Sequence, residues 1–400
     1  MKKIIVILAI LALAVSEKSI ACTSAVITGK ATPDGRPLLW KHRDTGFENN
    51  RMVFAQGSKY AYIGLVNSCD VNNREMWAGT NCAGFSIMNT ASYNLKSPDD
   101  KTDFQDREGI IMRMALEVCA TVEDFQHFLD TIAKPLGIET NFGVIDARGG
   151  AAFFEMNNFE YTKFDANDAE IAPNGYLIRT NFSYSGRTDE GMGYIRYETA
   201  VRLFKNHPTQ QFTPEWIFSS ATRSYYHSLL EIDLKTLYPI FAIDQDYIPR
   251  NSTSASIVFQ GVKKGESPER TTTWIALGFP SASIVLPLWI AGGEQLPEIL
   301  TRTAESNHAP LCDKVIALKR QTFPITRGNG RRYMDFSFLF NKNGDGVIQQ
   351  LQPFEKEIFE KTQQKINEWN ENGWSEQNIQ DYYKYLNDKV LKIYRELFGL

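Results

Sequence analysis

The stretch Ser19-Ile20-Ala21-Cys22-Thr23-Ser24-Ala25-Val26-Ile27 joins an apolar leader to an alternating segment. Upstream, the chain begins Met1-Lys2-Lys3 and then runs apolar from 4 to 15. A charged start, an apolar run and small residues at positions 19 and 21 are typical of a secretory signal peptide. The sequence therefore predicts a signal peptide at 1–21, cleavage after Ala21, and export to the periplasm or out of the cell. Cys22 then begins the mature chain.

An N-terminal cysteine carries a thiol and a free α-amine on one residue. An unperturbed α-amine has a pKa of about 7.7–8.0, so it can accept the proton of its own thiol. A structural cysteine and a lipidated cysteine remain alternatives for Cys22. Bacterial lipoprotein signals usually have an aliphatic residue where this chain has Ser19. The β-branched run from 23 to 28 predicts a strand, whereas a lipoprotein usually continues into a flexible tether.

Composition places the protein among ordinary globular chains. It has 400 residues, a formal net charge of -4 and 43% hydrophobic residues. The sequence contains no block of basic residues, so we do not expect nucleic acid as a partner. After residue 15 no apolar stretch is long enough to span a membrane as a helix, and the histidines show no metal-ligand spacing. We expect a small-molecule substrate and no cofactor. The sequence leaves open whether the protein forms a homo-oligomer.

Four further cysteines leave the disulfide state undecided. An exported protein with four cysteines can form two disulfides. A chain of this length does not need them for stability, so buried free thiols are an equal alternative. The four are Cys69, Cys82, Cys119 and Cys312.

Hydrophobic periodicity predicts an α+β protein. Helical spacing indicates helices over 106–120 and 193–205 and from 354 onward, with Thr121 as the N-cap of another. Strands around central helices predict one layered domain over 22–350 and a helical segment over 351–400. Alternation and turn chemistry predict strands at 22–29, 37–41, 60–66, 85–91, 141–146, 151–156, 160–164, 176–180, 254–262 and 272–277.

Four segments carry a family resemblance. They are Cys22-Thr23-Ser24 with Trp40-Lys41-His42-Arg43-Asp44, Gly79-Thr80-Asn81-Cys82-Ala83-Gly84-Phe85 with Asn89, Arg179-Thr180-Asn181, and Gly193-Tyr194-Ile195-Arg196-Tyr197. In this order they resemble the N-terminal-nucleophile amidases of the choloylglycine hydrolase, penicillin V acylase and isopenicillin-N acyltransferase group. The resemblance spans the first half of the mature chain. It implies a four-layer αββα fold and hydrolysis of a linear amide through a thioester.

The resemblance also assigns roles at the nucleophile. Cys22 attacks the amide carbonyl, and its own amine moves the proton. Asp44 holds that amine in place, although a turn-capping or ion-paired aspartate is the alternative. Lys41 stands where the bile-salt enzymes usually have arginine. As a point charge it would stabilise the thiolate, unless it is only a solvated lysine at a strand end.

Three further side chains complete the implied site. Asn181 and Asn89 would donate hydrogen bonds to the developing oxyanion. The family asparagine aligns either at Asn89 or at Ala91, and Asn81 is better suited to supporting a turn. Arg196 would pair with a buried carboxylate or join the active-site network, with a helix-surface arginine as the alternative.

The implied reaction leaves the substrate and the acyl acceptor open. The substrate joins an apolar acyl group to a small polar amine, as in bile-salt conjugates, penicillin V or N-acyl amino acids. An acyltransferase differs only in using an amine in place of water. A lipid-anchored surface protein with an acylated Cys22 is the alternative outside enzymes.

Overall fold

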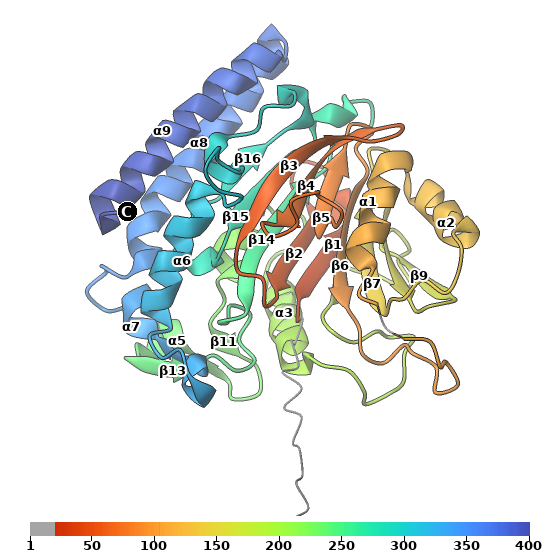
Figure 1. Cartoon of the computed structure of the whole chain (residues 1–400), viewed down its shortest axis with the longest axis horizontal. Coiled ribbons are helices and arrows are strands. Elements are labelled where there is room, and N and C mark those ends of the chain that lie inside the picture. The colour runs from red at the N-terminus through yellow and green to blue at the C-terminus, as the bar shows by residue number, and fades with distance from the viewer. Residues whose placement is uncertain (1–20, 104) are drawn as a thin grey trace, which may run out of the picture.

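Two antiparallel β-sheets stack face to face, and helices cover both outer faces (Figure 1). The computed structural model describes residues 21–103 and 105–400. The predicted signal peptide therefore lies outside the described residues except for Ala21. The described part has the four-layer αββα architecture that the resemblance implied.

The first sheet contains the segment that begins at Cys22. Its strand order is β10-β1-β2-β14-β15-β16. In this register Ser24 of β1 lies opposite Arg179 on one side and Lys41 on the other. Three parts of the predicted site therefore come together at one end of β1. The strands are β1 (Thr23–Ile27), β2 (Leu38–Asp44), β10 (Tyr176–Arg179), β14 (Thr253–Gln260), β15 (Thr272–Leu277) and β16 (Leu286–Leu288).

The second sheet is a meander in which each strand pairs with the next one along the chain. Alternation predicted most of it but missed β3 and β5. β5 has only four residues and includes a glycine, so it carries little periodic signal. The strands are β3 (Asn50–Gln56), β4 (Ala61–Asn67), β5 (Ala78–Asn81), β6 (Ser86–Ala91), β7 (Thr140–Ile145), β8 (Ala151–Met156) and β9 (Tyr161–Asp165).

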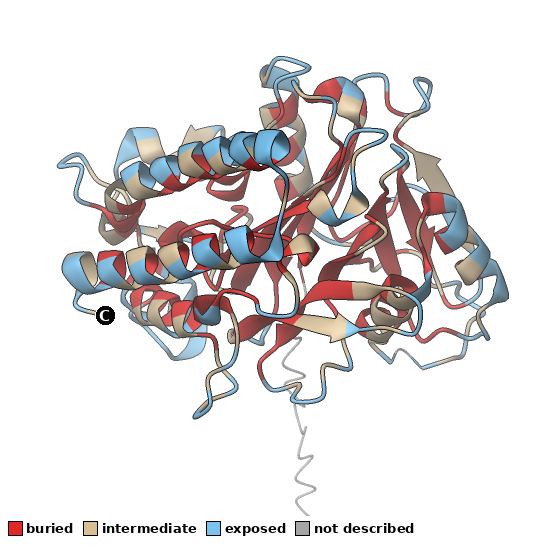
Figure 2. Cartoon of the chain, turned by 90° about the horizontal axis from the view of Figure 1, so that it is seen from above, coloured by how far each residue is buried: buried red, intermediate tan, exposed pale blue. Residues whose placement is uncertain are grey.

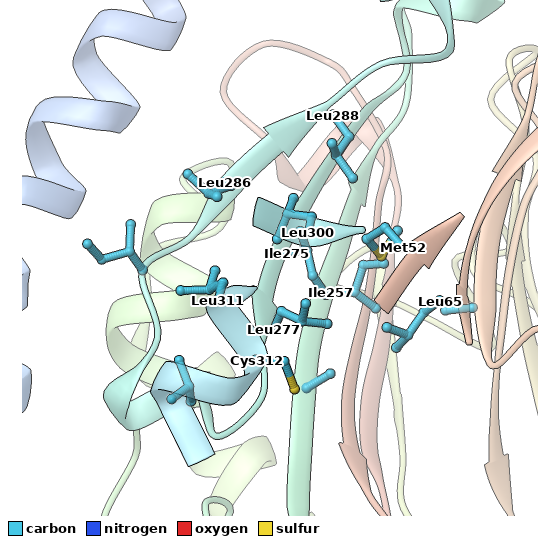
Figure 3. Close-up of a cluster of buried hydrophobic side chains, with 14 of the residues drawn as sticks. Met52, Leu65, Ile257, Ile275, Leu277, Leu286, Leu288, Leu300, Leu311 and Cys312 are labelled. Carbon is cyan, nitrogen blue, oxygen red and sulfur yellow. The ribbon is translucent and has the colours of Figure 1, made fainter. Parts of the chain in front are cut away.

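Period-two alternation divides the side chains of each strand between two cores. Val26 and Leu39 belong to the core between the sheets, whereas Ala25 and Trp40 belong to an outer core. Figure 3 shows part of the inner core, where side chains from both sheets meet; its labelled residues are Met52, Leu65, Ile257, Ile275, Leu277, Leu286, Leu288, Leu300, Leu311 and Cys312.

Helices form the outer layers. Helices α1 and α2 cover the second sheet, and α3 with a π-helical turn at Ile217–Thr222 covers the first. Thr121 is the N-cap of α2, as the sequence predicted, and it forms a reciprocal capping box with Asp124. The helices are α1 (Glu108–Val118), α2 (Val122–Thr131), α3 (Tyr194–Asn206), α4 (Pro214–Trp216), α5 (Leu234–Leu237), α6 (Pro310–Thr322) and α7 (Phe336–Leu339). Two small sheets pair β11 (Tyr226–His227) with β12 (Ile232–Asp233), and β13 (Phe241–Ile243) with β17 (Tyr333–Asp335).

The C-terminal segment forms two long helices, α8 (Val347–Asn372) and α9 (Glu376–Phe398). Their outward faces are exposed and their inward faces are buried (Figure 2). Glu355 of α8 forms a buried ion pair with Arg223, at 2.6 Å. Trp369 and other inward residues share the inner core with Val26. The predicted boundary between 350 and 351 falls inside α8, so these helices continue the main body without a break.

The sequence also raised the questions of disulfides and of membrane-spanning helices. All five cysteines lie in the described part and are free thiols, so they form no disulfide there. Among the described residues, no helix combines the length and apolar character needed to cross a membrane.

Candidate active site

Cys22 immediately precedes β1 and is buried, with 2% of its surface exposed. Because β1 pairs with β10, the chain that continues beyond Arg179 lies beside Cys22. The backbone N–H of Cys22 donates to Asn181 Oδ1 at 2.9 Å. In this structure Cys22 is still joined to Ala21, so its nitrogen is an amide. In a chain cleaved after Ala21, as the sequence predicts, this nitrogen would be the α-amine.

Arg196 of α3 holds the other end of the Cys22 backbone. Its Nη1 donates to Cys22 O at 2.6 Å and to Thr23 Oγ1 at 3.0 Å, and its Nη2 donates to Asn181 Oδ1 at 2.7 Å. Gly193 permits this approach, because a Cβ there would lie 2.3 Å from Arg196 Nη2. Arg196 is 1% exposed, and burial lowers its pKa to about 9. Arg196 is therefore buried in the network around Cys22 and is not a helix-surface residue.

Asn181 connects these groups. Its Oδ1 accepts hydrogen bonds from both Cys22 and Arg196. Its Nδ2 donates to Ala91 O, at the end of β6, at 2.8 Å. The side-chain amide is therefore fixed at both of its polar atoms, with its oxygen toward the Cys22 nitrogen.

A buried asparagine that the sequence analysis did not select positions Asn181. Asn141 of β7 donates through Nδ2 to the carbonyls of Thr180, at 3.3 Å, and Phe182, at 3.2 Å. Its Oδ1 accepts from Ser183 Oγ at 2.5 Å. Asn141, which lies in the opposite sheet, thus forms hydrogen bonds to the backbone on both sides of Asn181. The only signal in the sequence was an asparagine at the start of a predicted buried strand.

Lys41 lies in the interior and not in solvent, with 1% of its surface exposed. Its Nζ donates to Asn89 Oδ1 and to Trp77 O, both at 2.6 Å. Burial lowers the pKa of Lys41 to about 7, and the negative charge of a Cys22 thiolate opposes that shift. Asn89 donates through Nδ2 to Thr140 Oγ1 at 3.3 Å. The structure thus shows Asn89 as an acceptor for Lys41, and its oxyanion role stays a prediction.

Asp44 is fully buried at the end of β2. Its carboxylate accepts from Thr253 Oγ1 at 2.6 Å and forms an ion pair with Arg250 Nη2. Within the described residues these are its hydrogen-bond partners, and the Cys22 nitrogen is not among them. Arg250 Nη2 also reaches Ala21 O at 3.5 Å. The predicted hold of Asp44 on the amine is therefore not made while Ala21 is attached.

Arg250 is a second residue that sequence reasoning missed. It is a single arginine ahead of the strand β14, in a segment that the family resemblance did not reach. Its place beside Asp44 and Ala21 results from the pairing of β14 with β2. That long-range pairing left no local signal.

Asn81 supports the turn between β5 and β6, as the sequence predicted. Its Oδ1 accepts from the backbone N–H groups of Ala83 and Phe85, each at 3.1 Å. Its Nδ2 donates to the carbonyls of Leu116, at 2.8 Å, and Cys119, at 2.7 Å. The amide therefore fastens the turn to the end of α1.

One cavity and the acidic, cysteine and histidine side chains elsewhere in the described part of the fold do not form a second candidate site. A cavity of about 540 Å³ lies between α4 and α8, and none of the predicted site residues lines it. In the parts of the chain that the structure describes, no group of three or more His, Cys, Asp or Glu side chains is arranged to hold a metal ion. The Cys22 network is therefore the candidate catalytic site.

Comparison with known families gives a match over part of the chain. Residues 34–223 match the family described as acyl-coenzyme A:6-aminopenicillanic acid acyl-transferase. The matched segment includes Lys41, Asp44, Asn89, Asn181 and Arg196, but neither Cys22 nor the C-terminal helices. This segment is therefore similar to an acyltransferase family, in line with the resemblance that the sequence motifs carry.

Solved structures of low sequence identity are also similar to this chain. The Caenorhabditis elegans N-acylethanolamine-hydrolyzing acid amidase ortholog is 18% identical, with a TM-score of 0.42, covering 64% of this chain and 99% of that chain. A variant of conjugated bile acid hydrolase from Clostridium perfringens is 11% identical, with a TM-score of 0.41, and the match covers 67% of this chain and 92% of that chain. Penicillin V acylase from Agrobacterium tumefaciens is 12% identical, with a TM-score of 0.38, and the match covers 67% of this chain and 86% of that chain. A comparison with curated proteins gives no match.

Proposed function

We propose that this protein hydrolyses linear amide carbon–nitrogen bonds with Cys22 as an N-terminal nucleophile. We also propose that it is exported and that cleavage after Ala21 frees the Cys22 amine. One observation carries the proposal: Asn181 meets the Cys22 nitrogen and Arg196, and Arg196 in turn holds the Cys22 carbonyl. This network fixes the residue that must supply both nucleophile and base.

The reaction proceeds in two balanced halves. The α-amine takes the thiol proton, and Sγ bonds to the amide carbon, so that negative charge develops on the carbonyl oxygen. An N–H donor on Asn181 would stabilise that charge. The carbon–nitrogen bond then breaks, and the leaving amine receives the proton from the α-ammonium. Water, deprotonated by the same amine, attacks the thioester and releases the acid and the thiol.

The surface beside Asn181 favours an apolar acyl group. Tyr184, Met192 and Tyr194 are 50%, 40% and 40% exposed. The Phe182 ring stacks on Tyr194 with centroids 4.1 Å apart. Exposed apolar side chains gathered at a site are typical of ligand-binding surfaces. This wall would receive the acyl part of the substrate.

The test compares two forms of the same chain. One form is cleaved so that it begins at Cys22, and the other keeps Ala21 attached. Both are assayed on bile-salt conjugates, penicillin V and N-acyl amino acids, with Cys22→Ala as the control. We expect turnover only from the cleaved form, because an amide nitrogen is not basic. Full activity with Ala21 attached would rule out the free-amine mechanism.

An acyltransferase is the second candidate, because the matching family is described as one. The two activities share the thioester and differ only in whether water or an amine resolves it. Adding a small amine acceptor to the assay distinguishes them. Formation of a new amide in place of the free acid would identify the transferase.

A further inference from the structure

Exposed apolar side chains gather on one face of the small sheet formed by β13 and β17. Ile243 lies opposite Tyr333 in the register of these strands. Phe241 is two residues from Ile243, so period-two alternation puts all three side chains on the same face. Their exposed fractions are 51% for Phe241, 50% for Ile243 and 43% for Tyr333. Met334 points to the opposite face and is buried in the inner core.

Ile240 extends this apolar face at the start of β13. It is 68% exposed, and its carbonyl accepts from Phe336 N at 2.8 Å, which fastens it to the beginning of α7. Large apolar side chains that lie together on a surface, with polar residues around them, mark interaction sites. We refer to Ile240, Phe241, Ile243 and Tyr333 as the β13–β17 face.

The segment that leads into β17 is basic. Residues 320–334 contain four arginines and no aspartate or glutamate, although the whole chain has a net charge of -4. Arg332 pairs with Asp244 at 3.2 Å. Arg327 and Arg331 are exposed, and neither forms an ion pair with any residue that the structure describes. The positive charge beside the β13–β17 face is therefore not balanced.

Contacts keep these arginines next to the face. A Cβ at Gly330 would lie 2.2 Å from Ile325 Cγ2, so the chain on either side of Arg327 folds back on itself. Arg331 is two residues before Tyr333. The acid closest to them in the strands, Asp335, accepts from Phe338 N at 3.1 Å and so caps α7.

We propose that the β13–β17 face docks the protein on a lipid bilayer that carries anionic headgroups. The apolar side chains would enter the boundary between headgroups and acyl chains, and Arg327 and Arg331 would meet the headgroup charges. Charge favours a bilayer over a second copy of this chain. A symmetric dimer buries the same patch on both copies, so it would bring these unpaired arginines together.

The β13–β17 face lies close to the residue that precedes Cys22. Asn251 Nδ2 donates to Arg331 O at 2.7 Å. The neighbouring residue, Arg250, reaches Ala21 O at 3.5 Å. Docking would therefore bring the start of the mature chain near the bilayer. The proposal itself does not depend on the reaction at Cys22.

The test measures how tightly the chain that begins at Cys22 binds to vesicles of phosphatidylglycerol, which are anionic, and to vesicles of phosphatidylcholine, which carry no net charge. The chain is prepared without residues 1–21, because an apolar leader could itself enter a bilayer. We expect binding to the anionic vesicles that weakens as salt is added. The double variant Arg327→Gln with Arg331→Gln should bind about 25-fold more weakly, since each arginine near an anionic surface contributes about fivefold. Phe241→Ser should weaken binding about tenfold through the loss of apolar contact.

Two matched controls lie on the second sheet. Phe159→Ser removes a half-exposed ring from the turn between β8 and β9, and Arg148→Gln removes an exposed charge from the turn between β7 and β8. In Figure 1 β9 and β13 lie on opposite sides of the molecule. Both control variants should bind anionic vesicles as the wild type does.

Three results would overturn the proposal. They are no binding to either kind of vesicle, equal binding to both, and binding that the double arginine variant leaves unchanged. The arginine variant alters only exposed side chains, so it decides the question even if Phe241→Ser fails to fold. Sedimentation without vesicles adds a further check: a dimer that Phe241→Ser dissociates would show that a second copy covers this face, and would also overturn the proposal.

Discussion

The substitution Asn181→Asp separates the two ends of the Asn181 amide. An aspartate keeps an oxygen for the Cys22 nitrogen, at 2.9 Å, and for Arg196, at 2.7 Å. It removes the N–H donors, because an ionised carboxylate only accepts hydrogen bonds. We expect kcat to fall by about a hundred- to thousandfold, the effect of losing one oxyanion donor. KM should change little, since that donor acts on charge that develops only as the thiol adds.

The contacts of Asn181 also determine how far each substitution lowers the free energy of unfolding. Asn181→Asp loses the bond to Ala91 O, which is worth about 1 kcal/mol, and the attraction of its new charge to Arg196 offsets part of that loss. Asn181→Ala also removes the acceptor of a buried guanidinium, a bond worth about 1.5–3 kcal/mol. The alanine variant should therefore unfold at a lower temperature than the aspartate variant.

The assay measures kcat, KM and the melting temperature of the cleaved enzyme on one amide substrate. Asn329→Asp, at an exposed position in the 3-10 helix Gly328–Arg332 before β17, is the control and should behave as wild type. If Asn181→Asp keeps nearly wild-type kcat, Asn181 is not an oxyanion donor. The role would then pass to Asn89 or to a backbone N–H group.

Two further substitutions test the surroundings of the site, and a third tests the packing of α8. Asn141→Ala should lower kcat more than tenfold with little change in KM, because a displacement of about 1 Å at a reacting group can cost about a hundredfold; a change confined to the melting temperature would make Asn141 merely structural. Burial lowers the pKa of Lys41 from 10.5 to about 7. Between these two pH values the unfolded chain holds a proton that the folded chain has lost. The free energy of unfolding should therefore rise with pH by up to about 1.4 kcal/mol per pH unit. Lys41→Met should remove that rise in denaturant titrations at several pH values, and an unchanged slope would contradict it. Glu355→Gln should destabilise the fold by about 3–5 kcal/mol, because it leaves the buried Arg223 charge without its partner; thermal unfolding close to wild type would show that the pair does not secure α8.

The sequence predicted local elements well and long-range contacts poorly. Alternation located β8 and β15 to the residue, and Thr121 as a predicted N-cap located the start of α2. Helix α6 was missed although Pro310 at its first position is a typical helix start. Strand order could not be inferred from alternation, because the pairing of β14 with β2 joins segments about two hundred residues apart.

The candidate site shows the same division. Cys22 and Arg196 were found because short motifs carry them, and the structure brings them together with Asn181. Asn141 and Arg250 were not found, since their importance depends on burial and on distant partners. Asp44 was found, but its ion pair with Arg250 could not be read from a motif.

The most direct test of the central claim is the mass of the mature protein, measured after acid quenching during turnover of a slow amide substrate. We expect a chain that begins at Cys22, has a free α-amine, and carries the acyl mass on the Cys22 thiol. Cys22→Ala should show no acyl adduct. A diacylglyceryl mass on Cys22, or an active protein whose adduct lies on another residue, would contradict it.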